Sequence, residues 1–167
     1  MALDRNLLYY FVKDALAPYS ENFRILEKDN PTLLELNGEK YSVHVSYVHD
    51  SGNMRDNPDE DRIQIQRGII EGQRSLADDG IKVAFIGFFE DGKTFVAWEP
   101  RYVFSQNPQK GGSVYARKSH ADLVLEQLAA ARVIRARNLG EDTLVIALPS
   151  SALGFYIENI EHFHALP

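Results

Sequence analysis

The chain has 167 residues, of which 44% are hydrophobic and 25% charged, and this composition fits one globular domain with a sizeable core. It contains no cysteine, which excludes disulfides, thiolate metal sites and cysteine nucleophiles. The 18 basic and 24 acidic residues give a net charge of −6, so the global charge argues against a nucleic-acid partner. The first residues lack the order of a signal peptide and no apolar run reaches the roughly 20 residues of a membrane span, so we expect a cytoplasmic protein without membrane contact.

Hydrophobic periodicity predicts the secondary structure. Apolar residues at helical spacing predict helices at 7–16, 68–78, 122–131 and 155–163. Alternation or short apolar runs between turn-forming residues predict strands at 33–36, 41–48, 62–66, 81–89, 94–98, 114–116, 132–137 and 143–148. The strand at 41–48 reads as half-buried, with His44 on its polar face, and residues 50–61 read as an exposed loop.

The helices do not alternate regularly with the strands, which argues against a doubly wound parallel sheet. We therefore expect a mostly β fold with flanking helices (α+β by content), built on an open, barrel-like mixed sheet. No repeat, low-complexity tract or linker divides the chain. We expect a single domain over residues 1–167, either complete or as a fragment of a longer protein.

The charge distribution points to an anionic partner. Between Arg101 and Arg137 there are seven basic and two acidic residues, a net charge of +5. The other residues hold 11 basic and 22 acidic side chains, a net charge of −11. No acid occurs from Arg101 to Ala121, and a cationic face of this kind attracts anions over roughly 8–10 Å.

Catalytic motifs are absent or incomplete. Pro58-Asp59 offers the first half of a PD…(D/E)xK nuclease site, but Gln64-Ile65-Gln66 stands where the acid and the lysine would be required. The spacing of the histidines, including His44 and the pair His162 and His164, matches no metal-binding pattern. Serine-hydrolase and phosphate-loop motifs are missing as well. We expect no catalytic residue, no metal site and no cofactor.

Two groups of polar side chains suit the reading of DNA. The side chains of Gln and Asn can form hydrogen bonds with the edge of adenine, and that of Arg with the edge of guanine. We therefore expect the following residues to contact bases: Asn53, Arg55, Asn57, Arg62, Gln64 and Gln66. Lys, Arg, Ser and Tyr side chains typically contact phosphate groups. We therefore expect the following residues to contact the DNA backbone: Arg101, Lys110, Ser113, Tyr115, Arg117, Lys118 and Ser119. The alternative is that these residues only form the solvated face of a sheet.

The order of the motifs EDRIQIQ, FIGFFEDGKTFVAWEPR, GSVYARKS and FYIEN, separated by predicted helices and strands, resembles the pseudobarrel DNA-recognition domains of prokaryotic restriction systems. These include McrBC-like endonucleases, and they are similar to plant transcription-factor DNA-binding domains. The resemblance runs from about residue 41 to the end. It implies an open seven-stranded barrel that sends two arms, here about 49–66 and 100–119, into the major groove. The first arm contains acidic residues, such as Asp56 and Asp59, which would repel phosphate; this is a departure from what the resemblance implies.

From the residues and the resemblance we expect a non-catalytic module that binds double-stranded DNA and recognises the target of a prokaryotic restriction or defence system. A nuclease or motor domain, or another subunit, would then supply the catalytic activity. Two alternatives remain. The first is a metal-dependent nuclease with a degenerate active site. The second is a protein–protein interaction module that uses the acidic body, with Tyr9 and Tyr10 as anchors.

Overall fold

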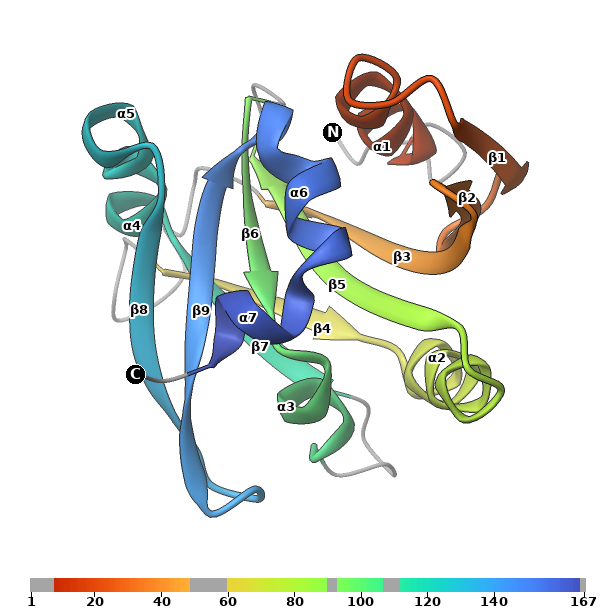
Figure 1. Ribbon diagram of the computed structural model, residues 1–167. Coiled ribbons are helices and arrows are strands. Elements are labelled where there is room, and N and C mark those ends of the chain that lie inside the picture. Colours follow the sequence, from red (N-terminus) through yellow and green to blue (C-terminus); the bar gives the residue numbers. More distant parts are fainter. Residues whose placement is uncertain (1–7, 49–59, 90–92, 107–111, 166–167) are drawn as a thin grey trace.

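The computed structural model describes residues 8–48, 60–89, 93–106 and 112–165 (Figure 1). The helices are α1 (Leu8–Leu16), α2 (Arg67–Asp78), α3 (Pro100–Phe104), α4 (Lys118–Asp122), α5 (Val124–Gln127), α6 (Leu153–Glu158) and α7 (Ile160–His164), with a 3-10 turn at Ser150–Ala152. The strands are β1 (Phe23–Glu27), β2 (Thr32–Leu36), β3 (Glu39–Val48), β4 (Glu60–Ile65), β5 (Lys82–Phe89), β6 (Thr94–Trp98), β7 (Gly112–Arg117), β8 (Ala130–Ala136) and β9 (Glu141–Pro149). No helix in the described part of the chain is long and apolar enough to cross a membrane.

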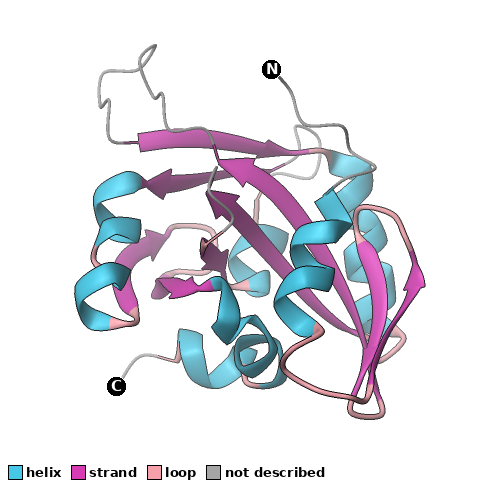
Figure 2. Cartoon of the chain, turned by 90° about the horizontal axis from the view of Figure 1, so that it is seen from above, coloured by secondary structure: helices cyan, strands magenta, loops and turns pink. Residues whose placement is uncertain are grey.

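Seven strands form one mixed sheet in the order β1-β2-β3-β5-β6-β9-β8. β3 and β5 run parallel, and all the other neighbouring strands run antiparallel. In Figure 2 the helices lie around these strands. The expectation of a mostly β fold with a seven-stranded mixed sheet and flanking helices is thus confirmed.

The two faces of the sheet are covered by different elements. One face presents Ile86, Phe88 and Phe95 to α1, α6 and α7. The opposite face presents Phe85 and Trp98 to α2, α3 and to β4 and β7. Strands β5 and β6 contribute to both apolar clusters because their alternate residues point to opposite sides. This explains why the segment 81–89 is apolar at almost every position.

β4 and β7 form a separate antiparallel ribbon and do not close the sheet into a barrel. The sheet is thus open, and the ribbon packs on one of its faces; the finer expectation, a DNA-recognition pseudobarrel, stays a prediction. The carbonyl oxygen of Tyr115 in β7 accepts hydrogen bonds from Nε1 of Trp98 and Nη2 of Arg132, both at 3.2 Å. Side chains of β6 and β8 thus provide the hydrogen bonds of this carbonyl oxygen.

The polar face of β3 is buried, although the sequence predicted a half-buried strand. The hydroxyl of Ser42 donates to Oε1 of Gln73 in α2, and Nε2 of Gln73 donates to the carbonyl of Ser42 at 3.0 Å. His44 is buried beside Phe85, with ring centroids 6.0 Å apart. Alternation within β3 could not reveal this burial, because the residue that covers Ser42 comes 31 positions later.

The helix expected at 122–131 is broken into short pieces. α4 begins earlier, at Lys118, and α5 ends at Gln127, followed by Leu128 in a left-handed conformation with φ at 64°. A leucine in this conformation costs about 1–2 kcal/mol. β8 begins at Ala130, within the range predicted to be helical. The expected C-terminal helix at 155–163 is also divided, at Asn159, and α3 and β1 were not predicted.

Replacing Gln73 by alanine should lower the free energy of unfolding by about 1–3 kcal/mol, because the change leaves buried polar groups of β3 without hydrogen bonds. Gln73 is 1% exposed and joins α2 to β3 and β5. Urea unfolding followed by circular dichroism measures the change. Gln127→Ala on exposed α5 is the matched control, expected to lie within about 0.5 kcal/mol of wild type. Equal effects of the two substitutions would show that the hydrogen bonds of Gln73 do not stabilise the sheet.

Candidate nucleic-acid interface

The β4–β7 ribbon has one apolar and one polar face. Its apolar side chains pack against the sheet; they are Ile63, Ile65, Val114 and Ala116. Its outward side chains are polar or aromatic; they are Arg62, Gln64, Ser113, Tyr115 and Arg117. Arg62 and Gln64 are exposed, and the other three are half-buried. A shift of the strand register by one residue would point the side chains of Arg62 and Gln64 into the core. Burial of the apolar face therefore keeps the polar side chains pointing outward.

The ribbon brings together residues that are about 50 positions apart in the sequence. In its register Arg62 lies opposite Tyr115, and Gln64 lies opposite Ser113. Nε and Nη2 of Arg62 donate to Oγ of Ser113 at 3.3 and 3.2 Å, which orients the guanidinium across the ribbon. Members of the predicted base-reading group and of the predicted phosphate group therefore share one face.

The ribbon is also fixed at the first residues of β7. Nε2 of Gln106, just after α3, donates to the carbonyl of Ser113 at 3.2 Å. Gly112 lies so close to α2 that a Cβ atom there would be 2.9 Å from Cδ1 of Ile70. A glycine at this position therefore allows α2 to pack closely against the strand.

Lys118 and Ser119 continue directly from β7 as the exposed first residues of α4. The turn is held by His120, whose Nε2 donates to the carbonyl of Ala130 at 2.9 Å. His120 is 5% exposed, and burial lowers its pKa below the ordinary value. The stretch from Gly112 to Ala121 contains two basic residues and no acid, whereas on the paired strand β4 Glu60 lies opposite Arg117 and Asp61 opposite Ala116.

Arg101 is not part of the ribbon. Its Nε contacts Oε1 of Glu99 at 2.6 Å and its Nη2 contacts Oε1 of Glu141 at 2.7 Å. The hydrogen bond with Glu99 is the main reason that the pKa of Arg101 is raised above its ordinary value. Two carboxylates thus compensate this guanidinium. Four other predicted contacts lie outside the described residues: Asn53, Arg55, Asn57 and Lys110.

Gln66 lies just past the end of β4, where it is exposed and occupies the N-cap position of α2 in an extended backbone conformation. It makes no capping hydrogen bond with its side chain. Tyr9, a proposed protein–protein anchor, is buried and stacks on Tyr10 with ring centroids 4.2 Å apart. Tyr10 alone of this pair remains exposed, at 43%.

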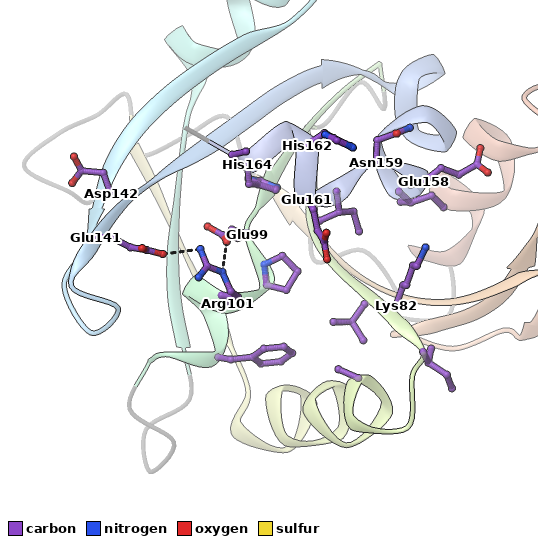
Figure 3. Close-up of a pocket in the computed structure, with 18 residues that line it drawn as sticks. Lys82, Glu99, Arg101, Glu141, Asp142, Glu158, Asn159, Glu161, His162 and His164 are labelled. Carbon is purple, nitrogen blue, oxygen red and sulfur yellow. Dashed lines mark hydrogen bonds and ion pairs between the residues drawn. The ribbon is translucent and has the colours of Figure 1, made fainter. Parts of the chain in front are cut away.

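Arg101 instead lines a cavity of about 710 Å³ that the sequence did not predict (Figure 3). Its apolar part includes Ile81, Val83 and Phe104. Its charged lining has five carboxylates, Glu99, Glu141, Asp142, Glu158 and Glu161, against the two cations Lys82 and Arg101. The volume is in the range of small-molecule sites, but the excess of carboxylates repels phosphate. No residue of β4 or β7 belongs to the lining found among the described residues.

His164, at the edge of this cavity, is held as a neutral imidazole. Its Nδ1 lies 2.6 Å from the carbonyl oxygen of Leu144, which can only accept, so Nδ1 donates. Its Nε2 then accepts from the hydroxyl of Tyr156 at 2.8 Å. Burial lowers the pKa of His164 below its ordinary value. Both ring nitrogens are engaged, and the described residues contain no group of three or more His, Asp or Glu side chains placed to hold a metal ion.

A family model described as methylase-associated X1 matches residues 39–157, more than two thirds of the chain. The chain belongs to the methylase-associated X1 family. The match covers the ribbon and β3 to β9, and it supports a domain associated with restriction–modification systems. No curated protein and no solved structure matches the chain significantly.

The buried histidines of this methylase-associated X1 domain predict a loss of stability in mild acid. The ordinary pKa of histidine is 6.5 and burial lowers it in the folded state for both His120 and His164. Below pH 6.5 the unfolded chain therefore binds more protons than the folded chain, and the free energy of unfolding decreases as the pH falls. The slope is at most about 1.4 kcal/mol per pH unit for each histidine.

Urea unfolding between pH 7.5 and about pH 5.5 tests this, above the range in which most carboxylates titrate. His164→Gln should flatten the dependence, whereas Gln127→Ala, which removes no titratable group from exposed α5, should leave it as in wild type. An equally steep dependence in His164→Gln and wild type would contradict the neutral state assigned to His164.

Proposed function

We propose that this methylase-associated X1 domain is a non-catalytic module of a restriction or defence system, and that it binds double-stranded DNA with the outer face of its β4–β7 ribbon. The observation that carries the proposal is the pairing of Arg62 with Tyr115 and of Gln64 with Ser113. Two groups chosen for their chemistry from distant parts of the sequence lie on a single face of two strands.

The shape of the ribbon suits the proposed partner. The major groove of B-DNA is about 12 Å wide and admits a two-stranded β-ribbon. Arg62 and Gln64 project from the same face of β4, about 6.5–7 Å apart at the usual strand rise. This spacing is about two base-pair steps, so each side chain would reach a separate base pair. Arginine suits a guanine edge and glutamine an adenine edge.

The phosphate contacts would come from the end of the ribbon where Arg117, Lys118 and Ser119 follow one another, next to the acids Glu60 and Asp61 of β4. Arg101 is removed from the set that the sequence suggested, because Glu99 and Glu141 already compensate its charge. The carboxylates of the cavity also favour an approach of DNA from the side of the ribbon. They repel phosphate from the cavity, whereas the run from Gly112 to Ala121 attracts it.

The same residues argue for a module without its own chemistry. Gln64 is exposed on the ribbon where a nuclease of the PD…(D/E)xK type would need a carboxylate. Within the part of the chain that the structure describes, no cluster of carboxylates and histidines could hold a metal ion. The family name points to a methylase as a natural companion. Cleavage, translocation or methyl transfer would then be performed by another domain or subunit.

Arg117→Ala and Arg101→Ala form a matched pair that separates a phosphate contact from a structural ion pair. Each neutralised phosphate adds roughly 0.9 to the slope of log K against log salt concentration. Arg117→Ala should therefore weaken binding to all duplexes alike and flatten the slope by about one unit. Arg101→Ala should leave the slope as in wild type. Fluorescence anisotropy on a random duplex over a series of salt concentrations measures both, and an unchanged slope in Arg117→Ala would refute the assignment.

Gln64→Ala should cost specificity rather than general affinity. A good bidentate contact contributes roughly 1–3 kcal/mol of discrimination, so affinity for a preferred site should fall by about 5- to 150-fold. Affinity for a scrambled duplex should change little. The preferred site comes from selection on a random library, and Gln127→Ala on α5 is the control. Equal losses on both duplexes, or no loss, would mean that Gln64 does not read a base.

A further inference from the structure

The cavity that Arg101 lines lies at one end of the large sheet (Figure 3). β5 and β9 begin at this end and β6 ends there, because β6 runs antiparallel to both of them. Its lining comes from these strand ends, from α2 and α3, and from α6 and α7. The volume of about 710 Å³ and the mixture of apolar and charged side chains are typical of a small-molecule site.

The lining carries an excess of negative charge that its ion pairs do not remove. Five carboxylates stand against two cations, an excess of three negative charges. Two of these groups also pair with residues outside the lining: Lys82 with Glu39 at 3.0 Å, and Asp142 with Arg135 at 3.5 Å. These pairs bring in one acid and one base, so the excess stays the same. A cavity with partly apolar walls and charge of one sign raises the local concentration of the opposite ion.

Part of the excess lies at the end of β6. Glu99 and Glu141 both contact the guanidinium of Arg101, so two carboxylates share one positive charge. The other oxygen of Glu99 accepts a hydrogen bond from the hydroxyl of Thr143, which is a neutral donor. One negative charge of this group is therefore left for a further partner.

The rest of the excess lies on α6 and α7. Glu158 accepts hydrogen bonds from the hydroxyl of Tyr19 and from Nδ2 of Asn37, which are neutral donors. Glu161 is exposed in α7 and points toward the cavity in Figure 3. Within the part of the chain that the structure describes, neither carboxylate forms an ion pair.

The positions of the carboxylates favour an organic cation over a metal ion. Among the described residues, no three His, Asp or Glu side chains converge closely enough to hold a metal. A ligand with an apolar body can contact Ile81, Val83 and Phe104 while its cationic group reaches a carboxylate. Planar amidinium and guanidinium groups suit this arrangement, because they donate charge-assisted hydrogen bonds to carboxylates in a fixed geometry.

We propose that this cavity binds a small organic cation, with the cationic group beside Glu161 and the apolar body against Val83 and Phe104. No described residue of β4 or β7 lines the cavity, and the inference does not rest on DNA binding.

Three probes with the same aromatic ring test the proposal: benzamidine carries a positive charge, benzamide is neutral and benzoate carries a negative charge. Each is titrated at millimolar concentrations into the full chain without DNA, at pH 7.5, and followed by the amide shifts in ¹H–¹⁵N NMR spectra. Benzamidine should bind most tightly and benzoate most weakly, and the shifts should lie at Arg101 and between residues 157 and 165. Absence of benzamidine shifts at these residues, or benzamide binding as tightly as benzamidine, would overturn the proposal.

Glu161→Lys and Glu126→Lys form a matched pair, because each reverses the charge of one exposed glutamate and changes the net charge equally. Glu161→Lys should raise the dissociation constant of benzamidine by roughly 2- to 30-fold, because a partly exposed attraction becomes a repulsion of similar size. Glu126→Lys, on α5 outside the lining, should leave the constant as in wild type. Circular dichroism checks that both variants are folded. Equal effects of the two substitutions would show attraction by the net charge alone and would contradict a site in the cavity.

Discussion

The carbonyl oxygen of Tyr115 connects the β4–β7 ribbon to the large sheet. It accepts hydrogen bonds from the indole of Trp98 on β6 and from the guanidinium of Arg132 on β8. Each such bond contributes about 0.5–1.5 kcal/mol, and the apolar cluster beneath the ribbon adds the larger share. Because Trp98 is 1% exposed, the ribbon cannot move away without opening the core. The outer face of the ribbon therefore has a rigid support, as the proposed contact with DNA bases would require.

The basic residues that the sequence suggested as phosphate contacts lie in different parts of the fold. Arg101 connects α3 to the start of β9 through Glu99 and Glu141 (Figure 3). Arg117 and Lys118 lie at the end of the ribbon, where Glu60 of β4 is opposite Arg117. The sequence alone placed all three in one phosphate-binding group. The structure places Arg101 away from the ribbon, beside Glu99 and Glu141, because the surroundings of a side chain depend on the fold rather than on the local composition.

The strands of the sheet were predictable where periodicity was local. The short apolar run at 33–36 and the alternation at 62–66 each identified a strand correctly. The pairing of β4 with β7 could not be predicted from local pattern, because it joins residues about 50 positions apart. The helix predicted at 122–131 is broken, because Leu128, which supported the helical spacing, is exposed and adopts a left-handed conformation. Spacing shows which residues share a face, but it does not show what covers that face.

Binding of the wild-type chain to random-sequence duplex DNA at two salt concentrations tests the central claim most directly. Fluorescence anisotropy with a labelled duplex, in the absence of metal ions, should show binding at low salt that weakens steeply when the salt concentration is raised, as expected when basic side chains displace counterions from phosphates. Absence of binding at low salt, or binding that is insensitive to salt, would contradict the assignment of the β4–β7 ribbon as a DNA-binding surface.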